Sequence, residues 1–150
     1  MAVSDVASEL DSTLENSRTP LLAITEPAAG LHPAPGAWSK KQILGHLIDS
    51  AANNHQRFVR LQSEDSLVLP SYQQNDWVRT QNYDGRQWRE LVELWLAYNR
   101  HLAHVMRHMD TRAAGHVWKG PAGDVSLAFV MEDYLRHLRH HLEQILHSPE

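Results

Sequence analysis

The sequence contains no cysteine among its 150 residues. This absence excludes disulfide bonds, thiolate metal ligands and a cysteine nucleophile. A chain without cysteine is typical of reducing compartments, and we expect a cytoplasmic protein.

Runs of basic residues and long apolar runs are also missing. Lysine and arginine number 14 against 18 aspartate and glutamate residues, which gives a net charge of -4. This balance disfavours nucleic acid and anionic membrane surfaces as partners. The N-terminal stretch MAVSDVASELDS is acidic and has no apolar core, so it predicts neither a signal peptide nor a membrane span.

Strand-like alternation is scarce, and Ser66–Pro70 is the only short candidate. Helical periodicity recurs instead. A first helix is predicted from near Ser4, with a kink or break at Pro20, because proline lacks the backbone donor and clashes with the preceding turn. The segment Glu26–Ala37 is rich in proline and glycine and is predicted to be a connector.

Three more helices follow from the same pattern. Ser39 and Gln42 form a capping box that starts the second helix, which we expect to run to residue 62. Residues 63–83 look irregular and too long for an ordinary loop. The third helix is predicted from about Asp84 to about Met109, and the fourth from Ser126 to near His147, after a turn-rich connector at Gly115–Asp124.

These elements predict an all-α fold, a four-helix bundle that forms a single domain over residues 1–150. The connectors differ in length, which allows at least one of them to cross the bundle. The apolar stripes predict large core residues on three of the helices: Leu47, Trp88, Trp95 and Leu138.

Histidine is unusually frequent, with 11 residues. His137 and His141 are four residues apart and lie on the same flank of the apolar face of the fourth helix, whereas His140 points away from it. His46 lies on a polar stripe beside the apolar face of the second helix, together with Asn53 and Arg57. Two such flanks can meet inside a bundle and satisfy each other.

Spacing alone is weak evidence for a metal, because pairs four residues apart are common in a chain rich in histidine. His104 and His108 have the same spacing, but they lie far from the apolar face and are predicted to be solvated. His55 is predicted to be a core histidine with a hydrogen-bond partner, and His101 lies near the core edge. The stronger combination is His137 and His141 with a third donor, His46, from another helix.

Three neutral imidazoles suit zinc, nickel and other late divalent ions. No fourth protein ligand is evident. A set of three ligands leaves coordination positions for water or substrate, which is the arrangement of a catalytic site.

Two segments resemble a known family. WSKKQILGHLIDSAANNHQRF (Trp38–Phe58) and HLRHHLEQI (His137–Ile145) resemble the end motifs of the DinB-like, or YfiT-like, four-helix bundle proteins, and Asn75–Trp77 resembles a segment between them. The resemblance implies a divalent metal, nickel or zinc, bound by His46, His137 and His141, and it implies a homodimer. Relatives of this kind include thiol S-transferases and many proteins without an established reaction.

These observations lead to a metal-dependent enzyme of the thiol S-transferase or hydrolase type that acts on a small molecule. Asn53 or Arg57 could hold a carboxylate of a cosubstrate, and ordinary polar packing explains both residues equally well. Tyr72 and Trp77 could line a lid or simply pack a loop. Asp49 could orient a ligand histidine or lie at the surface.

Two alternatives belong to other classes of protein. In one, the bundle binds metal for stability or sensing and has no catalytic activity. In the other, the histidines are incidental and the bundle is an interaction module without a metal.

Overall fold

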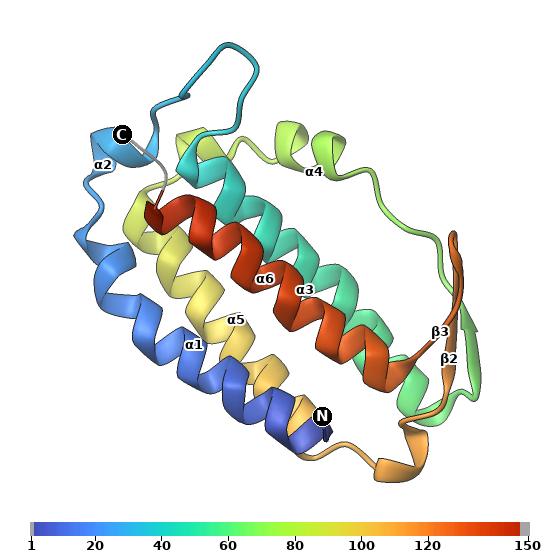
Figure 1. The fold of residues 1–150 in the computed structure, drawn as a ribbon. Helices are drawn as coiled ribbons and strands as arrows, with labels where there is room; N and C mark the ends of the chain where they lie inside the picture. The colour runs from blue at the N-terminus through green and yellow to red at the C-terminus, as the bar shows by residue number, and fades with distance from the viewer. Residues whose placement is uncertain (1, 148–150) are drawn as a thin grey trace.

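A computed structural model describes residues 2–147 of the chain. Four long helices dominate it: α1 (Val3–Ala23), α3 (Lys40–Ser63), α5 (Trp88–Arg107) and α6 (Leu127–His147). They lie side by side as a bundle (Figure 1). The predicted all-α four-helix bundle is therefore confirmed. Within the described residues, no helix is long and apolar enough to cross a membrane.

The order of the helices around the bundle differs from their order in the chain. α1 packs against α5 and α6, and α3 also packs against α5 and α6. α3 and α5 start at the same end of the bundle, so the chain between them has to run back along the whole length of α3 (Figure 1). One connector therefore crosses the bundle, and it covers the outer side of α3.

This crossing connector is more ordered than its sequence predicts. It contains strand β1 (Ser66–Val68), helix α4 (Gln74–Thr80) and the 3-10 turn η1 (Tyr83–Gly85). The prediction of an irregular segment over residues 63–83 is therefore wrong. α4 packs on α3, and its residue Val78 is buried. Packing against α3 supplies the order that the local sequence lacks.

The second connector, predicted to be turn-rich, forms a hairpin. After the 3-10 turn η2 (Thr111–Ala113), strand β2 (Val117–Gly120) pairs antiparallel with β3 (Gly123–Ser126), and Gly123 has a φ of 119°. β2 also pairs in parallel with β1, which makes a three-stranded sheet. The sheet joins segments about fifty residues apart. The strand candidate at Ser66–Pro70 is confirmed as β1, but no local pattern predicts its pairing with β2. The short first connector holds one further helix, α2 (Glu26–Ala29).

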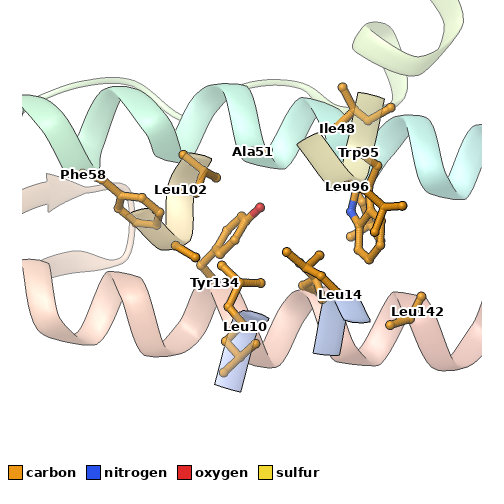
Figure 2. Close-up of a cluster of buried hydrophobic side chains, with 14 of the residues drawn as sticks. Leu10, Leu14, Ile48, Ala51, Phe58, Trp95, Leu96, Leu102, Tyr134 and Leu142 are labelled. Atoms are coloured by element: carbon orange, nitrogen blue, oxygen red, sulfur yellow. The ribbon is translucent and has the colours of Figure 1, made fainter. Parts of the chain in front are cut away.

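The core lies along the axis of the bundle. Figure 2 shows side chains from all four long helices converging there, among them Leu14, Phe58, Trp95 and Tyr134. The four residues predicted for the core are each at most 2% exposed: Leu47, Trp88, Trp95 and Leu138. Burial of apolar area of this kind is the main favourable contribution to folding.

Two of the predicted helix starts, at Ser39 and near Ser126, agree with the structure. The Ser39 hydroxyl accepts from the Gln42 backbone N–H, and the Gln42 side chain accepts from Ser39, which is a complete capping box. Ser126 caps α6 by accepting from Phe129 N–H at 3.1 Å. Of the kink or break predicted at Pro20, the break does not occur, because α1 continues to Ala23. Pro20 is exposed, so water can hydrate the carbonyl group that lacks its donor.

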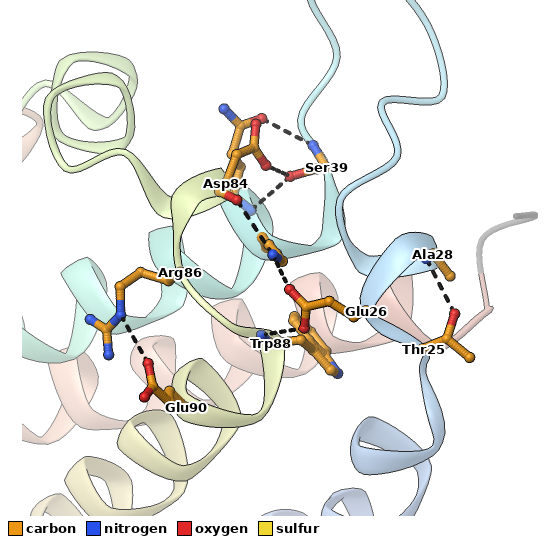
Figure 3. A network of polar contacts seen from close by, with 10 residues as sticks. Thr25, Glu26, Ala28, Ser39, Asp84, Arg86, Trp88 and Glu90 are labelled. Atoms are coloured by element: carbon orange, nitrogen blue, oxygen red, sulfur yellow. Dashed lines mark hydrogen bonds and ion pairs between the residues drawn. The ribbon is translucent and has the colours of Figure 1, made fainter.

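The third long helix begins at Trp88 and not at Asp84. Asp84 instead accepts from the Ser39 hydroxyl at 2.5 Å, and Trp88 N–H donates to Glu26 at 2.8 Å. Lys41 pairs with the same Glu26. Figure 3 shows this network, which joins α2 to the starts of α3 and α5. It fixes the end of the bundle at which α3 begins.

Gly45 gives the connector its closest approach to α3. The ring of Tyr83 lies against Gly45, and a Cβ atom built at this position would come within 2.1 Å of that ring. Tyr83 is buried, and its hydroxyl donates to Asp49 at 2.6 Å. The ring therefore has no free direction in which to move.

We predict that Gly45→Ala lowers the free energy of unfolding by about 1–3 kcal/mol, since an overpacked site costs more than the roughly 1 kcal/mol of helix propensity that alanine gains. Urea unfolding measures the change. Gly115→Ala is the control, because nothing lies within 4 Å of the added Cβ atom. Equal stability of Gly45→Ala and wild type would show that Tyr83 does not pack here.

Candidate metal centre

Three histidines from two helices meet inside the bundle. His46 comes from α3, and His137 and His141 come from successive turns of α6. One ring nitrogen of each lies within 4.8 Å of the others, and Nε2 of His46 is 3.2 Å from Nε2 of His137. Within residues 2–147 this is the one group of three or more potential ligand side chains with such spacing. The structure thus brings together the three residues selected from the sequence.

The environment keeps two of these imidazoles, His46 and His137, neutral. His46 is 1% exposed. Burial, followed by the neighbouring His137 and His141, lowers the pKa of His46 to about 4. Burial and then His141 lower the pKa of His137 to about 4 as well, although Asp133 opposes the shift. At neutral pH both rings are uncharged, and a neutral ring is the form that donates a lone pair to a metal.

The hydrogen bonds around the rings also fit a metal. Nδ1 of His141 lies 2.8 Å from Oε1 of Gln144. An amide oxygen only accepts, so Nδ1 carries the proton and Nε2 keeps its lone pair. Nε2 of His46 lies 3.2 Å from Nε2 of His137, and Nδ1 of His46 is buried with no partner among the described residues. Each neutral imidazole has one unprotonated ring nitrogen, whose lone pair can bind a divalent ion. The donor set therefore fits a late divalent ion.

Gln144 contacts the centre, and the sequence alone assigned it no role. It lies three residues after His141, one turn along α6, and this spacing was the available signal. Partners of this kind fix the tautomer and orientation of a ligand histidine. On the other side, the ring of Trp38 packs against His46 with centroids 5.2 Å apart.

The remaining histidines do not join the centre. His140 is exposed, and His104 and His108 lie together on the outer face of α5 with ring centroids 4.2 Å apart. His55 is half-buried, and its Nδ1 lies 2.9 Å from the hydroxyl of Tyr98. His55 therefore has a hydrogen-bond partner, as predicted. His101 is exposed beside it.

Asp49 fits neither interpretation drawn from the sequence. It is 2% exposed, so it is not a surface residue. Its Oδ1 accepts from Tyr83 and Gln81, and its Oδ2 has no partner among the described residues, so it holds no ligand histidine. Burial raises the pKa of Asp49 despite these two hydrogen bonds. The crossing connector covers this side of α3, which the helix pattern of α3 alone does not reveal.

A cavity of about 380 Å³ opens beside the histidines, and we call it the central cavity. It lies between α3, α6, the hairpin and the crossing connector. Its wall includes His46, Asn54, Arg57, Ser50, Tyr72, Gln74, Trp118, Phe129, Asp133, Tyr134 and His137. A volume of this size is in the range of small-molecule sites.

Some of the other residues proposed from the sequence line this cavity, and others do not. Arg57 lines it, whereas Asn53 is not among its lining residues and donates to the backbone oxygen of Asp49 at 2.9 Å. The neighbouring Asn54 takes the place on the wall. Tyr72 lines the cavity, and Trp77 packs on Tyr72 from outside, with 37% of its surface exposed.

Comparisons with known proteins show the family to which this chain belongs. The profile of the DinB superfamily matches residues 9–145. Proteins of Oceanobacillus iheyensis and Halalkalibacterium halodurans, each named "putative metal-dependent hydrolase", are 24% and 22% identical over 115 and 114 residues. Each alignment covers 73% of this chain, and the chain spans 64% of the length of these curated relatives.

A solved structure shares the fold. YfiT from Bacillus subtilis, described as a probable metal-dependent hydrolase with an unusual four-helix bundle topology, superimposes with a TM-score of 0.80. The match covers 95% of this chain and 81% of that one, at 18% identity. At this identity the likeness shows the fold.

We predict that Ala replacement of His46, His137 or His141 weakens binding of zinc or nickel by at least about 100-fold, because loss of an outer partner alone costs about 10–100-fold. Gln144→Ala should weaken metal binding by only about 10–100-fold. Competition with a chromophoric chelator measures the affinities.

The matched controls are His140→Ala, His104→Ala and His108→Ala, which should keep wild-type affinity. Equal, small losses in all six histidine variants would indicate adventitious binding by a histidine-rich surface. Loss in His140→Ala with retention in His137→Ala would place the metal elsewhere.

We also predict that the metal-free protein loses stability as the pH falls from about 6.5 towards about 4. The unfolded histidines take up protons near pH 6.5, whereas folded His46 and His137 stay neutral down to about pH 4. The unfolded state therefore binds more protons in this interval, and acid favours it. Urea midpoints at about pH 7 and about pH 5 measure the loss. A His46→Gln/His137→Gln double variant should lose less, and an identical loss would contradict the assigned pKa values.

Proposed function

The chain belongs to the DinB superfamily, and we propose that it is a metal-dependent enzyme that acts on a small molecule. In this proposal His46, His137 and His141 hold one divalent ion. The observation that carries it is the convergence of three imidazoles from two helices, two of which, His46 and His137, line the central cavity. Three protein ligands leave room for water or substrate, which is the arrangement of catalytic zinc sites.

The metal ion would act as a Lewis acid that polarises a carbonyl group and lowers the pKa of a water molecule or thiol. Zinc and nickel are the ions we propose, since imidazole nitrogens suit both. Gln144 would hold the His141 ring in the tautomer that leaves Nε2 free. Trp38 would shield the His46 ring from solvent.

The central cavity would bind the substrate and exclude water from it. Tyr72 and Trp118 would form aromatic walls, with Trp118 held by a hydrogen bond from its indole N–H to Leu69 O at 2.8 Å. Burial, and then the charge of Asp49, raise the pKa of Tyr72 to about 12, so its hydroxyl is a proton donor at neutral pH. We propose hydrolysis as the first reaction to test, because it is the activity named for the curated relatives.

Thiol S-transfer is the second proposed reaction. The chain has no cysteine, so the thiol would have to come from a cosubstrate. The wall residue Arg57 would suit a carboxylate of such a cosubstrate, as was inferred from the sequence. Asn53 would act only indirectly, through its hydrogen bond to the Asp49 backbone. Homodimerisation and a cytoplasmic location stay predictions from the resemblance and from the composition.

We predict that zinc-loaded or nickel-loaded protein turns over a member of one of two panels. The first panel holds fluorogenic esters and amides, and the second pairs low-molecular-weight thiols with chlorodinitrobenzene. His137→Ala should lose the activity together with the metal, and His140→Ala should keep both. Bound metal without turnover in either panel would favour the non-catalytic metal-binding bundle. Turnover that survives in His137→Ala would remove the metal from the reaction.

A further inference from the structure

Arg57 is a buried cation on the same side of α3 as the metal centre. It follows His46 by eleven residues, which is three helical turns plus about 20°, so the two side chains share one face. Their Cα atoms are about 16 Å apart along the helix axis. Both residues line the central cavity, although Arg57 is only 6% exposed.

The guanidinium group has few partners. Nη1 donates to Oδ1 of Asn54 at 3.0 Å, and Nε is buried with no partner among the described residues. The Trp118 ring lies against the guanidinium plane, with Cζ 3.9 Å from the ring centroid. Within residues 2–147 no carboxylate pairs with Arg57. A buried guanidinium with five donors and one acceptor is incomplete.

The one carboxylate on the cavity wall is engaged elsewhere. Asp133 pairs with Arg136 on the outside of α6, and its charge acts on His137. Burial lowers the pKa of Arg57, but arginine stays protonated in proteins. Arg57 is therefore a cation on the cavity wall with no carboxylate paired to it among the described residues.

A buried cation without a counter-ion costs folding free energy, and an apolar side chain of similar size would remove that cost. An incoming anion would supply both the missing charge and the missing acceptors. Monoanions fit better than dianions, because a single guanidinium is the only cationic side chain among the described residues of the wall. A carboxylate matches the planar fork of arginine.

We propose that Arg57, oriented by Asn54 and Trp118, binds a carboxylate of the substrate. This inference rests on the proposed function for the identity of the reacting group, which lies near His46 and His137. The spacing along α3 places the carboxylate several bonds away from that group. The substrate class is accordingly a carboxylic acid whose reactive bond lies remote from its carboxylate.

Binding of small probes tests the proposal without any turnover. The probes are benzoate, its neutral isostere benzamide, and phenyl phosphate, and the Trp118 indole N–H signal in NMR spectra reports their binding. We expect benzoate to bind at least about tenfold more tightly than benzamide, because a hydrogen bond to a charged group contributes about 1.5–3 kcal/mol. Phenyl phosphate should bind more weakly than benzoate.

Variants assign the effect to Arg57. Arg57→Gln should remove the preference for benzoate, while Arg60→Gln should keep it. Arg60 lies on the same helix, is exposed and pairs with Glu64. Arg60→Gln therefore removes the same charge as Arg57→Gln, but outside the cavity. Arg57→Lys replaces Arg57→Gln if the latter does not fold, and it should bind benzoate less tightly than wild type because it lacks the fork.

Each titration is run on zinc-loaded and on chelator-treated full-length protein. A preference for benzoate that depends on Arg57 without zinc supports the anion site, even if the metal-dependent function fails. Three results would overturn the proposal: equal binding of benzoate and benzamide, a preference that persists in Arg57→Gln, or a preference lost equally in Arg60→Gln. A stronger preference for phenyl phosphate would overturn the carboxylate assignment.

Discussion

Three imidazole rings packed close together, with His46 fully buried, are the constraint on which the rest of this structure depends. Buried polar groups cost free energy unless they find partners, and here two ring nitrogens face each other at 3.2 Å with a third ring within reach. Protonation would make these rings cationic and unable to bind a metal, but burial lowers the pKa of His46 and His137 to about 4. The protein thus presents neutral donors at neutral pH, and an ion of suitable softness is the partner that satisfies them.

The topology explains why there is space beside these rings. Because α3 and α5 begin at the same end of the bundle, a long connector has to return along α3, and the hairpin between α5 and α6 closes on it through the β1–β2 pairing. The central cavity lies beneath this cover. Gly45 lets Tyr83 reach Asp49, which fixes the connector against α3. Helices α3 and α6 supply the three histidines, and the connectors supply much of the cavity wall.

The sequence predicts the helices and the three histidines well, because both depend on helical periodicity. The Ser39 capping box starts α3 as predicted, and the flanks of α3 and α6 point His46, His137 and His141 towards each other. Prediction from the sequence fails where the structure depends on contacts between distant parts of the chain. The β1–β2 pairing joins Leu67 to Trp118, and the burial of Asp49 comes from the crossing connector. The predicted break at Pro20 does not occur for a different reason. Pro20 lies at the exposed end of α1, where losing one backbone hydrogen bond costs little free energy.

The central claim is that one divalent ion is bound by three histidines of two helices. Anomalous diffraction at the zinc absorption edge from crystals of zinc-loaded protein tests it most directly. The account predicts one strong peak inside the bundle, with Nε2 of His46, His137 and His141 each at a zinc–nitrogen distance of about 2.0–2.1 Å. A peak between His104 and His108 on the outer face of α5, with none inside the bundle, would contradict it.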